Sequence, residues 1–260
     1  HVRSRRQRQM CIRDRGGVAR IDDLLIAAVK AAGPKPDDDA PQKLKNPWGN
    51  KISNTLAVAI AQELRERGME GTRPAEPGTI GLSGAERRLA GGLGAKNVDV
   101  TWATEESGLM LACSVKTIMF RDKTSNNFQK NLTNRRGDLL FESTTLHRRF
   151  PYAVLGGFFF FDIGASLDGT PKRASTFDNV FPRFRIFTRR ADPADREEQF
   201  ERLYVLLVDS NPFDPSVVCY EVNNRDEPVP LERAFDELVM LTAERNFDIY
   251  QAESGVIGKA

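Results

Sequence analysis

The chain has 260 residues, of which 40% are hydrophobic and 28% are charged, so it can bury a sizeable core and wholesale disorder is not expected. Its formal net charge of only +2 argues against a uniformly basic protein, so any surface for nucleic acid must be local. Three widely spaced cysteines and two histidines argue against a disulfide framework, a zinc ribbon, a histidine-ligand metal site and a Ser-His-Asp triad.

The beginning of the chain differs from the rest. His1–Arg15 contains six arginines and one aspartate but no periodic apolar face, and Met10–Arg15 resembles a translated sequencing adapter. We predict that residues 1–15 are a non-native or disordered basic segment and that residues 16–260 form a single domain. A basic arm that contacts nucleic acid is the alternative. Without the six arginines and the aspartate, the formal net charge falls from +2 to −3.

The next part of the chain is predicted to be mainly helical. Ile21–Ala32 has helical spacing and ends at Gly33-Pro34, after which Pro34–Asn46 is polar and is expected to be a linker. Thr55–Arg67 is predicted to form a second helix, capped by Ser53 or Asn54. Ala85–Leu93 is expected to form a short third helix.

The hydrophobic period then changes from that of a helix to that of a strand. Asn97–Thr104 alternates between apolar and polar residues, and Leu109–Phe120 is a second extended run, so we predict a β-hairpin. Asp99 is expected on one face of the first strand, with Thr101. The apolar residues expected on the opposite face are Val98, Val100 and Trp102.

The rest of the chain alternates between helices and strands after a polar loop at Arg121–Asn134. The nearly all-apolar run Ala153–Phe161 is typical of a central strand that is covered on both faces. We predict an α/β fold with a mixed central β-sheet flanked by helices on both faces. The remaining predicted elements are helices at Asp138–Arg149, Asp192–Arg202 and Leu231–Glu244 and strands at Leu203–Val208 and Val217–Val222.

The hairpin brings together residue types that can hydrolyse a phosphodiester. Ser114 and Lys116 are two residues apart and share a face, while Val115 points to the core. A carboxylate such as Asp99 can bind a divalent metal, and a nearby ammonium can stabilise the negative charge that develops on the phosphate. The hairpin is therefore the candidate active site.

Val98-Asp99 on one strand and Ser114-Val115-Lys116 on the next resemble the motif of the PD-(D/E)XK nuclease superfamily, which includes many restriction endonucleases. The resemblance covers about Asn97–Phe161. It implies a restriction-endonuclease-like fold and Mg²⁺-dependent cleavage of double-stranded DNA, with Mn²⁺ as a second candidate cofactor. The chain departs from the motif at Val98, which replaces proline, and at Ser114, which replaces the second acid.

Some restriction enzymes of that superfamily share this Ser-X-Lys form and take the missing acid from the helix after the lysine strand. The resemblance implies that Glu142 fills this place and holds the metal together with Asp99. Asp138 and Glu63 are the alternative donors. By the same resemblance, Lys116 would act at the scissile phosphate, and Ser114 would support the site by hydrogen bonding.

Local charge favours nucleic acid near the hairpin, since Val115–Arg149 has eight lysines and arginines against three acids. The candidates for contacts with DNA are Arg121, Lys123, Asn131, Arg135 and Arg136. Lys172–Arg190 is also basic, with interleaved phenylalanines. Either a second DNA contact or a solvated helix with its phenylalanines in the core fits that run. We expect His147 to balance a helix dipole rather than to act as a base.

The DNA hypothesis implies partners and a cellular location. A homodimer is expected if both strands are cut, because two-fold symmetry matches a palindromic site. The longest apolar run, Tyr152–Phe161, is too short to cross a bilayer, so we expect no membrane partner. The resemblance to restriction enzymes implies a cytoplasmic protein of prokaryotic or phage-related origin. The alternatives are a catalytically inactive DNA-binding module of the same fold and a non-enzymatic interaction protein.

Overall fold

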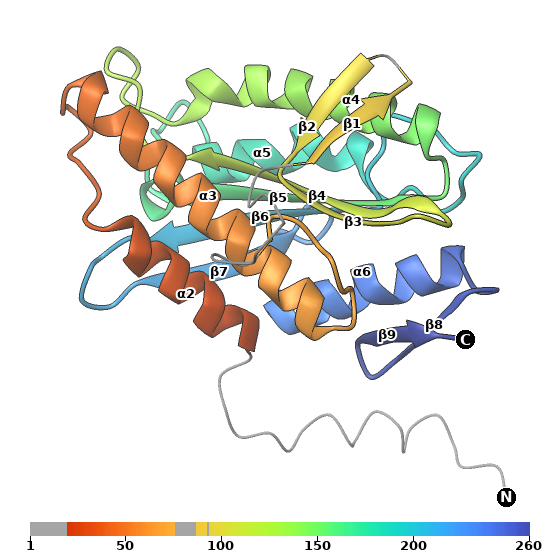
Figure 1. Cartoon of the computed structure of the whole chain (residues 1–260). Coiled ribbons are helices and arrows are strands. Elements are labelled where there is room, and N and C mark those ends of the chain that lie inside the picture. Colours follow the sequence, from red (N-terminus) through yellow and green to blue (C-terminus); the bar gives the residue numbers. More distant parts are fainter. Residues whose placement is uncertain (1–19, 76–86, 93) are drawn as a thin grey trace, which may run out of the picture.

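A computed structural model of the protein describes residues 20–75, 87–92 and 94–260 (Figure 1). The prediction for residues 1–15 lies outside these ranges. Within them, none of the helices combines the length and the apolar character that crossing a membrane requires.

A five-stranded mixed sheet forms the centre of the fold, in the order β3-β4-β5-β6-β7. The three inner strands are parallel to one another, and β3 and β7 run antiparallel at the two edges. The strands are β3 (Val100–Thr104), β4 (Gly108–Ile118), β5 (Val154–Asp162), β6 (Arg202–Asp209) and β7 (Ser216–Glu221). The predicted hairpin and the predicted central strand are both confirmed.

Helices cover both faces of this sheet, as predicted. One hydrophobic cluster joins the sheet to α2 (Arg20–Ala32), α3 (Gln42–Glu66) and α6 (Leu231–Arg245). The other cluster joins it to α4 (Leu132–Arg149) and α5 (Thr176–Phe184). Figure 1 shows α4 (green) above the sheet and α6 (blue) beneath it.

The all-apolar sequence of β5 follows from this sandwich of layers. Phe158 and Phe160 pack in the cluster with α3 and α6, whereas Phe159 and Phe161 pack in the cluster with α4 and α5. Because successive side chains of a strand point to opposite faces, a strand that is covered on both sides is apolar at most of its positions, as β5 is up to Asp162.

The helix α3 begins earlier than predicted, at Gln42 instead of Thr55, so the expected linker is shorter. Its first turns are mostly polar and contain Pro47, so the sequence shows no helical period of apolar residues there. Trp48 anchors this part: its ring is buried, and its indole N–H donates to the Gly33 carbonyl at 3.0 Å. A tertiary contact thus stabilises a helix that propensity alone does not predict.

The segment before the hairpin also differs from the prediction. In place of the helix expected at Ala85–Leu93, β1 (Arg87–Gly91) pairs antiparallel with β2 (Gly94–Val98). The chain bends at Asp99, between β2 and β3, so the predicted strand Asn97–Thr104 is divided in two. As a result, Val98 packs in the α4 cluster, on the opposite face from Val100 and Trp102.

Two further differences lie in the second half of the chain. The helix expected at Asp192–Arg202 is absent there, because Asp192 and Asp195 accept hydrogen bonds from neighbouring backbone N–H groups and form turns. The helix α4 begins at Leu132, inside the predicted loop.

The remaining short elements are η2 (Gln129–Asn131), η3 (Ile163–Ser166), η4 (Arg185–Phe187), β8 (Tyr250–Glu253) and β9 (Val256–Lys259).

Candidate active site

The carboxylate of Asp99 is fixed by the hairpin itself. Its Oδ2 accepts a hydrogen bond of 2.7 Å from the backbone N–H of Val115 and one of 3.2 Å from Nζ of Lys116. The bend between β2 and β3 turns this residue toward the partner strand, so backbone geometry holds the acid in place. Such positioning by strands keeps a functional group more precisely than a loop does.

Lys116 lies between two carboxylates. It faces the α4 side of the sheet, and its Nζ lies 3.2 Å from Asp99 Oδ2 and 3.4 Å from Glu142 Oε2. The two acid oxygens therefore cannot be further apart than the sum of these two distances. The structure thus brings together the strand acid, the strand lysine and the helix acid that the resemblance implied.

Lys116 is well shielded from solvent, with 13% of its side chain exposed. Burial lowers the pKa of the Lys116 ammonium, but the carboxylates of Glu142 and Asp99 raise it by more, and the net shift is upward. The ammonium is therefore charged at neutral pH. In this arrangement it can stabilise negative charge but cannot accept a proton.

Ser114 shares the face of Lys116, as the alternation predicts, and is buried. Its Oγ has no hydrogen-bond partner among the described residues. A buried hydroxyl without a partner costs about 1–3 kcal/mol, and native structures usually satisfy such a group with water or a ligand. The Ser114 hydroxyl is therefore available for a hydrogen bond on the same face as Lys116.

The two alternative acids are not brought to this site. Glu63 projects from α3, on the opposite face of the sheet, and its carboxylate is bound by Arg20 and Arg67. Asp138 lies one turn before Glu142 on α4, with 49% of its side chain exposed, and pairs with Arg135 at 3.3 Å. Glu142, which is buried, is therefore the second acid of the site.

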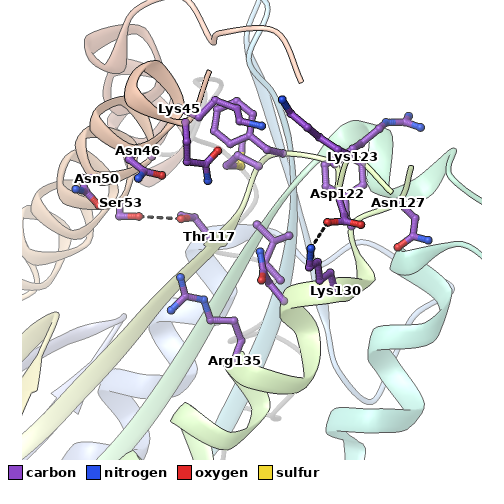
Figure 2. A pocket seen from close by; sticks show the side chains of 18 of the residues that line it. Lys45, Asn46, Asn50, Ser53, Thr117, Asp122, Lys123, Asn127, Lys130 and Arg135 are labelled. Carbon is purple, nitrogen blue, oxygen red and sulfur yellow. Dashed lines mark hydrogen bonds and ion pairs between the residues drawn. The ribbon is translucent and has the colours of Figure 1, made fainter. Parts of the chain in front are cut away.

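A polar cavity of about 700 Å³ opens where β4 ends (Figure 2). One wall comes from the N-terminal half of α3, and the other comes from η2 and the first turn of α4. Four of the five predicted DNA contacts line it, namely Arg121, Lys123, Asn131 and Arg135, whereas Arg136 does not.

The cavity is electropositive. Its lining contains five lysines and arginines but one acid, Asp122. The Lys130 ammonium, together with the backbone N–H of Ser125, holds the pKa of that carboxyl well below its ordinary range, so Asp122 is ionised. Lys123 has neither a hydrogen bond nor an ion pair with any described residue. The cavity is thus suited to an anionic partner.

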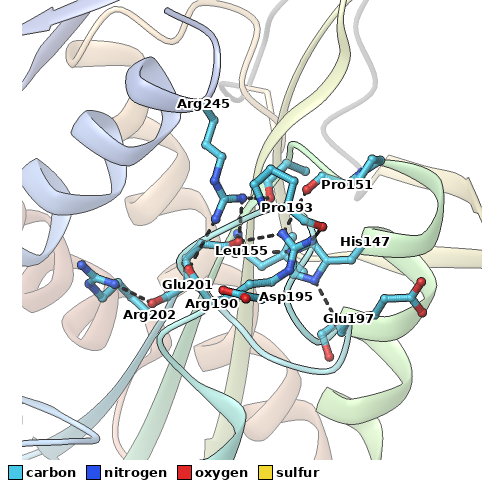
Figure 3. Close-up of polar contacts among 12 residues, drawn as sticks. His147, Pro151, Leu155, Arg190, Pro193, Asp195, Glu197, Glu201, Arg202 and Arg245 are labelled. Carbon is cyan, nitrogen blue, oxygen red and sulfur yellow. Dashed lines mark hydrogen bonds and ion pairs between the residues drawn. The ribbon is translucent and has the colours of Figure 1, made fainter.

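Sequence reasoning missed a second charged cluster, which is fully buried (Figure 3). Oε1 of Glu201 pairs with Arg190 at 3.1 Å and with Arg245 at 2.9 Å. Its Oε2 accepts from the backbone N–H of Leu155 and lies 3.4 Å from Nε2 of His147. His147 lies in the last turn of α4, as expected, and is buried against Glu201.

The phenylalanines of the second basic run, Lys172–Arg190, pack in the core. Phe181, Phe184 and Phe187 are buried in the cluster with α4 and α5, and Phe177 is partly buried against it. The core position that we predicted for these rings is confirmed, and a DNA contact of the basic side chains in this run stays a prediction.

Comparison with known proteins identifies no family. No family model matches the chain, and no curated protein or solved structure is significantly similar to it. Function is therefore inferred from the geometry of Asp99, Lys116 and Glu142 and from the cavity at the end of β4.

Proposed function

We propose that this protein is a metal-dependent endonuclease with a restriction-endonuclease-like fold, which hydrolyses phosphodiester bonds of double-stranded DNA as type II restriction enzymes do. The observation that carries the proposal is the contact of Lys116 Nζ with both Asp99 and Glu142. Such hydrolysis needs two acids and one ammonium. Here one acid and the ammonium lie on a rigid hairpin, and the other acid lies on the helix that packs on it.

The site fits a divalent metal. Asp99 and Glu142 would hold it, because Mg²⁺ commonly binds one or two carboxylates and fills its other positions with water and phosphate oxygens. Among the described residues, histidine, cysteine and acidic side chains nowhere gather in threes, so a closed all-protein metal cage is not expected. Bound Mg²⁺, or Mn²⁺ in its place, would polarise the phosphate and lower the pKa of a water molecule.

The chain's own residues position and stabilise the reacting groups. The Val115 N–H and the Lys116 ammonium orient the Asp99 carboxylate, so the acid is preorganised. The charged Lys116 would stabilise the negative charge that develops on the scissile phosphate, an effect that is larger in a shielded site than in water. Ser114 would donate its hydrogen bond to a water molecule at the site.

The electropositive cavity supports DNA as the substrate. Thr117 and Ile118, the two residues that follow Lys116 at the end of β4, line the cavity, so a DNA backbone bound there would pass close to the site. Lysine and arginine contacts to phosphates give DNA-binding proteins much of their affinity. Because both strands of a duplex must be cut, we propose that the enzyme acts as a homodimer.

Conversion of supercoiled plasmid to nicked and linear forms tests the proposal. We expect cleavage in Mg²⁺ or Mn²⁺ and none in excess chelator. Lys116→Met is expected to reduce the rate by about 10²–10³-fold, as the loss of one charge-stabilising group does, while binding of DNA persists.

Glu106→Gln is the matched control, since it removes an exposed acid from the turn of the same hairpin and should leave the rate unchanged. Binding of the plasmid by the wild-type protein without cleavage in either metal would contradict the nuclease and favour an inactive DNA-binding module.

A further inference from the structure

One wall of the cavity, formed by α3, carries neutral amide side chains. Along α3, the amides of Gln42, Asn46 and Asn50 follow one another at intervals of four residues, so they lie on one face of the helix. All three are exposed, and all three line the cavity. None of them makes a side-chain hydrogen bond to a described residue, so their donors and acceptors are available. We call this set the amide row.

The opposite wall carries positive charge. Lys130 and Arg135 lie across the cavity from Asn46 and Asn50 (Figure 2). Cationic side chains bind phosphates without regard to sequence, whereas asparagine and glutamine form paired hydrogen bonds with the N6 and N7 edge of adenine. The two walls together match a nucleic-acid strand, with its phosphates on one side and its bases on the other.

The amide row is also tied to the proposed catalytic strand. Ser53, one turn after Asn50, has its Oγ 2.8 Å from Oγ1 of Thr117, the residue that follows Lys116. The row rises about 12 Å from Gln42 to Asn50, at ~1.5 Å per residue. This length corresponds to three or four base-pair steps of ~3.4 Å. The helix α3 thus holds the amide row in a fixed position relative to the end of β4, although Thr117 faces α3 and Lys116 faces α4.

We propose that the amide row of α3 is the sequence-reading element of the enzyme and contacts adenine edges in the major groove next to the cleaved phosphate. This inference rests on the proposed function. The cavity volume is typical of ligand sites and far below that of a duplex, so the duplex would lie across the mouth of the cavity. The backbone of one strand would then contact Lys130 and Arg135.

Selection of bound duplexes from a randomised library tests this proposal, with Ca²⁺ in place of Mg²⁺ so that no strand is cut. Asn46→Ala and Asn50→Ala should each lower the preference for adenine at one or two adjacent positions by about ten-fold or more. Asn54→Ala is the matched control, because Asn54 is an exposed amide of the same helix that does not line the cavity. Its selected sequences should equal those of the wild type. Circular dichroism verifies that each variant is folded.

The outcomes separate the two proposals. If the wild type selects a sequence and both cavity variants select the same one with equal strength, the amide row is not the reading element, and the nuclease proposal stands. If the wild type binds and cuts DNA without any preference, the reading element is again excluded. If the wild type does not bind DNA, both proposals fail.

Discussion

At the scale of single residues, the titration of Lys116 provides a test. Its two carboxylate partners outweigh burial, so its pKa is raised. While both carboxylates are ionised, its ion pairs stabilise the folded protein fully below the unfolded value of about 10.4, and that contribution is lost as the pH rises through the folded pKa. NMR of isotope-labelled lysine, assigned with Lys116→Arg, should give a midpoint above ~10.4. A midpoint near neutrality would contradict the charge-stabilising role.

The positions of Asp99, Ser114 and Lys116 on one hairpin could be predicted from strand alternation, and in the structure the acid and the lysine are in contact. The bend at Asp99 was not predictable, because it depends on the tertiary hydrogen bond to Val115. The contact with Glu142 depends on how α4 packs, and periodicity contains no information on that.

At the scale of elements, apolar content predicts the centre of the sheet well and its surroundings less well. The strands β5 and β6 agree with the predicted strands to about one residue at each end, because a strand covered on both faces is apolar at most of its positions. The early turns of α3 and the turns around Asp192 were mispredicted, since a buried tryptophan in one case and local side-chain hydrogen bonds in the other decide the conformation.

The buried cluster around Glu201 joins several elements, and we expect it to stabilise the folded protein. Burial raises the pKa of Glu201, but His147 and Arg245 lower it by more, so the carboxylate is ionised at neutral pH. Its stabilising effect is present above the unfolded value of about 4.3 and is lost as the pH falls through the lowered folded value. Glu201→Gln leaves buried arginines without their partner and should reduce the free energy of unfolding by about 3–5 kcal/mol in urea titrations.

Glu197→Gln is the control for this experiment. Glu197 pairs with Arg148 on the surface, where both side chains are largely exposed, so its loss should cost less than about 1 kcal/mol. If the two substitutions reduce the free energy of unfolding equally, the buried ion pairs stabilise the protein no more than a surface ion pair does.

At the scale of the whole molecule, the proposed DNA binding depends on local charge, because the formal net charge is only +2. On this proposal, the cations that line the cavity at the end of β4 supply the affinity. The logarithm of the binding constant should fall linearly with the logarithm of the salt concentration, and Lys130→Ala should reduce the slope by about one. Arg233→Ala, at an exposed position of α6, should leave the slope unchanged. If Lys130→Ala leaves the salt dependence of binding unchanged, the DNA binds elsewhere on the protein.

If Asp99 and Glu142 share a divalent cation beside Lys116, binding of Mn²⁺ must depend on both carboxylates, and electron paramagnetic resonance in the presence of a short duplex measures that binding. We expect Glu142→Gln to weaken Mn²⁺ binding by at least the roughly 10- to 100-fold that even an outer-shell partner contributes, whereas Asp138→Asn should bind as the wild type does. Unchanged Mn²⁺ binding in Glu142→Gln, or equal loss in both variants, would show that the two carboxylates do not share a metal.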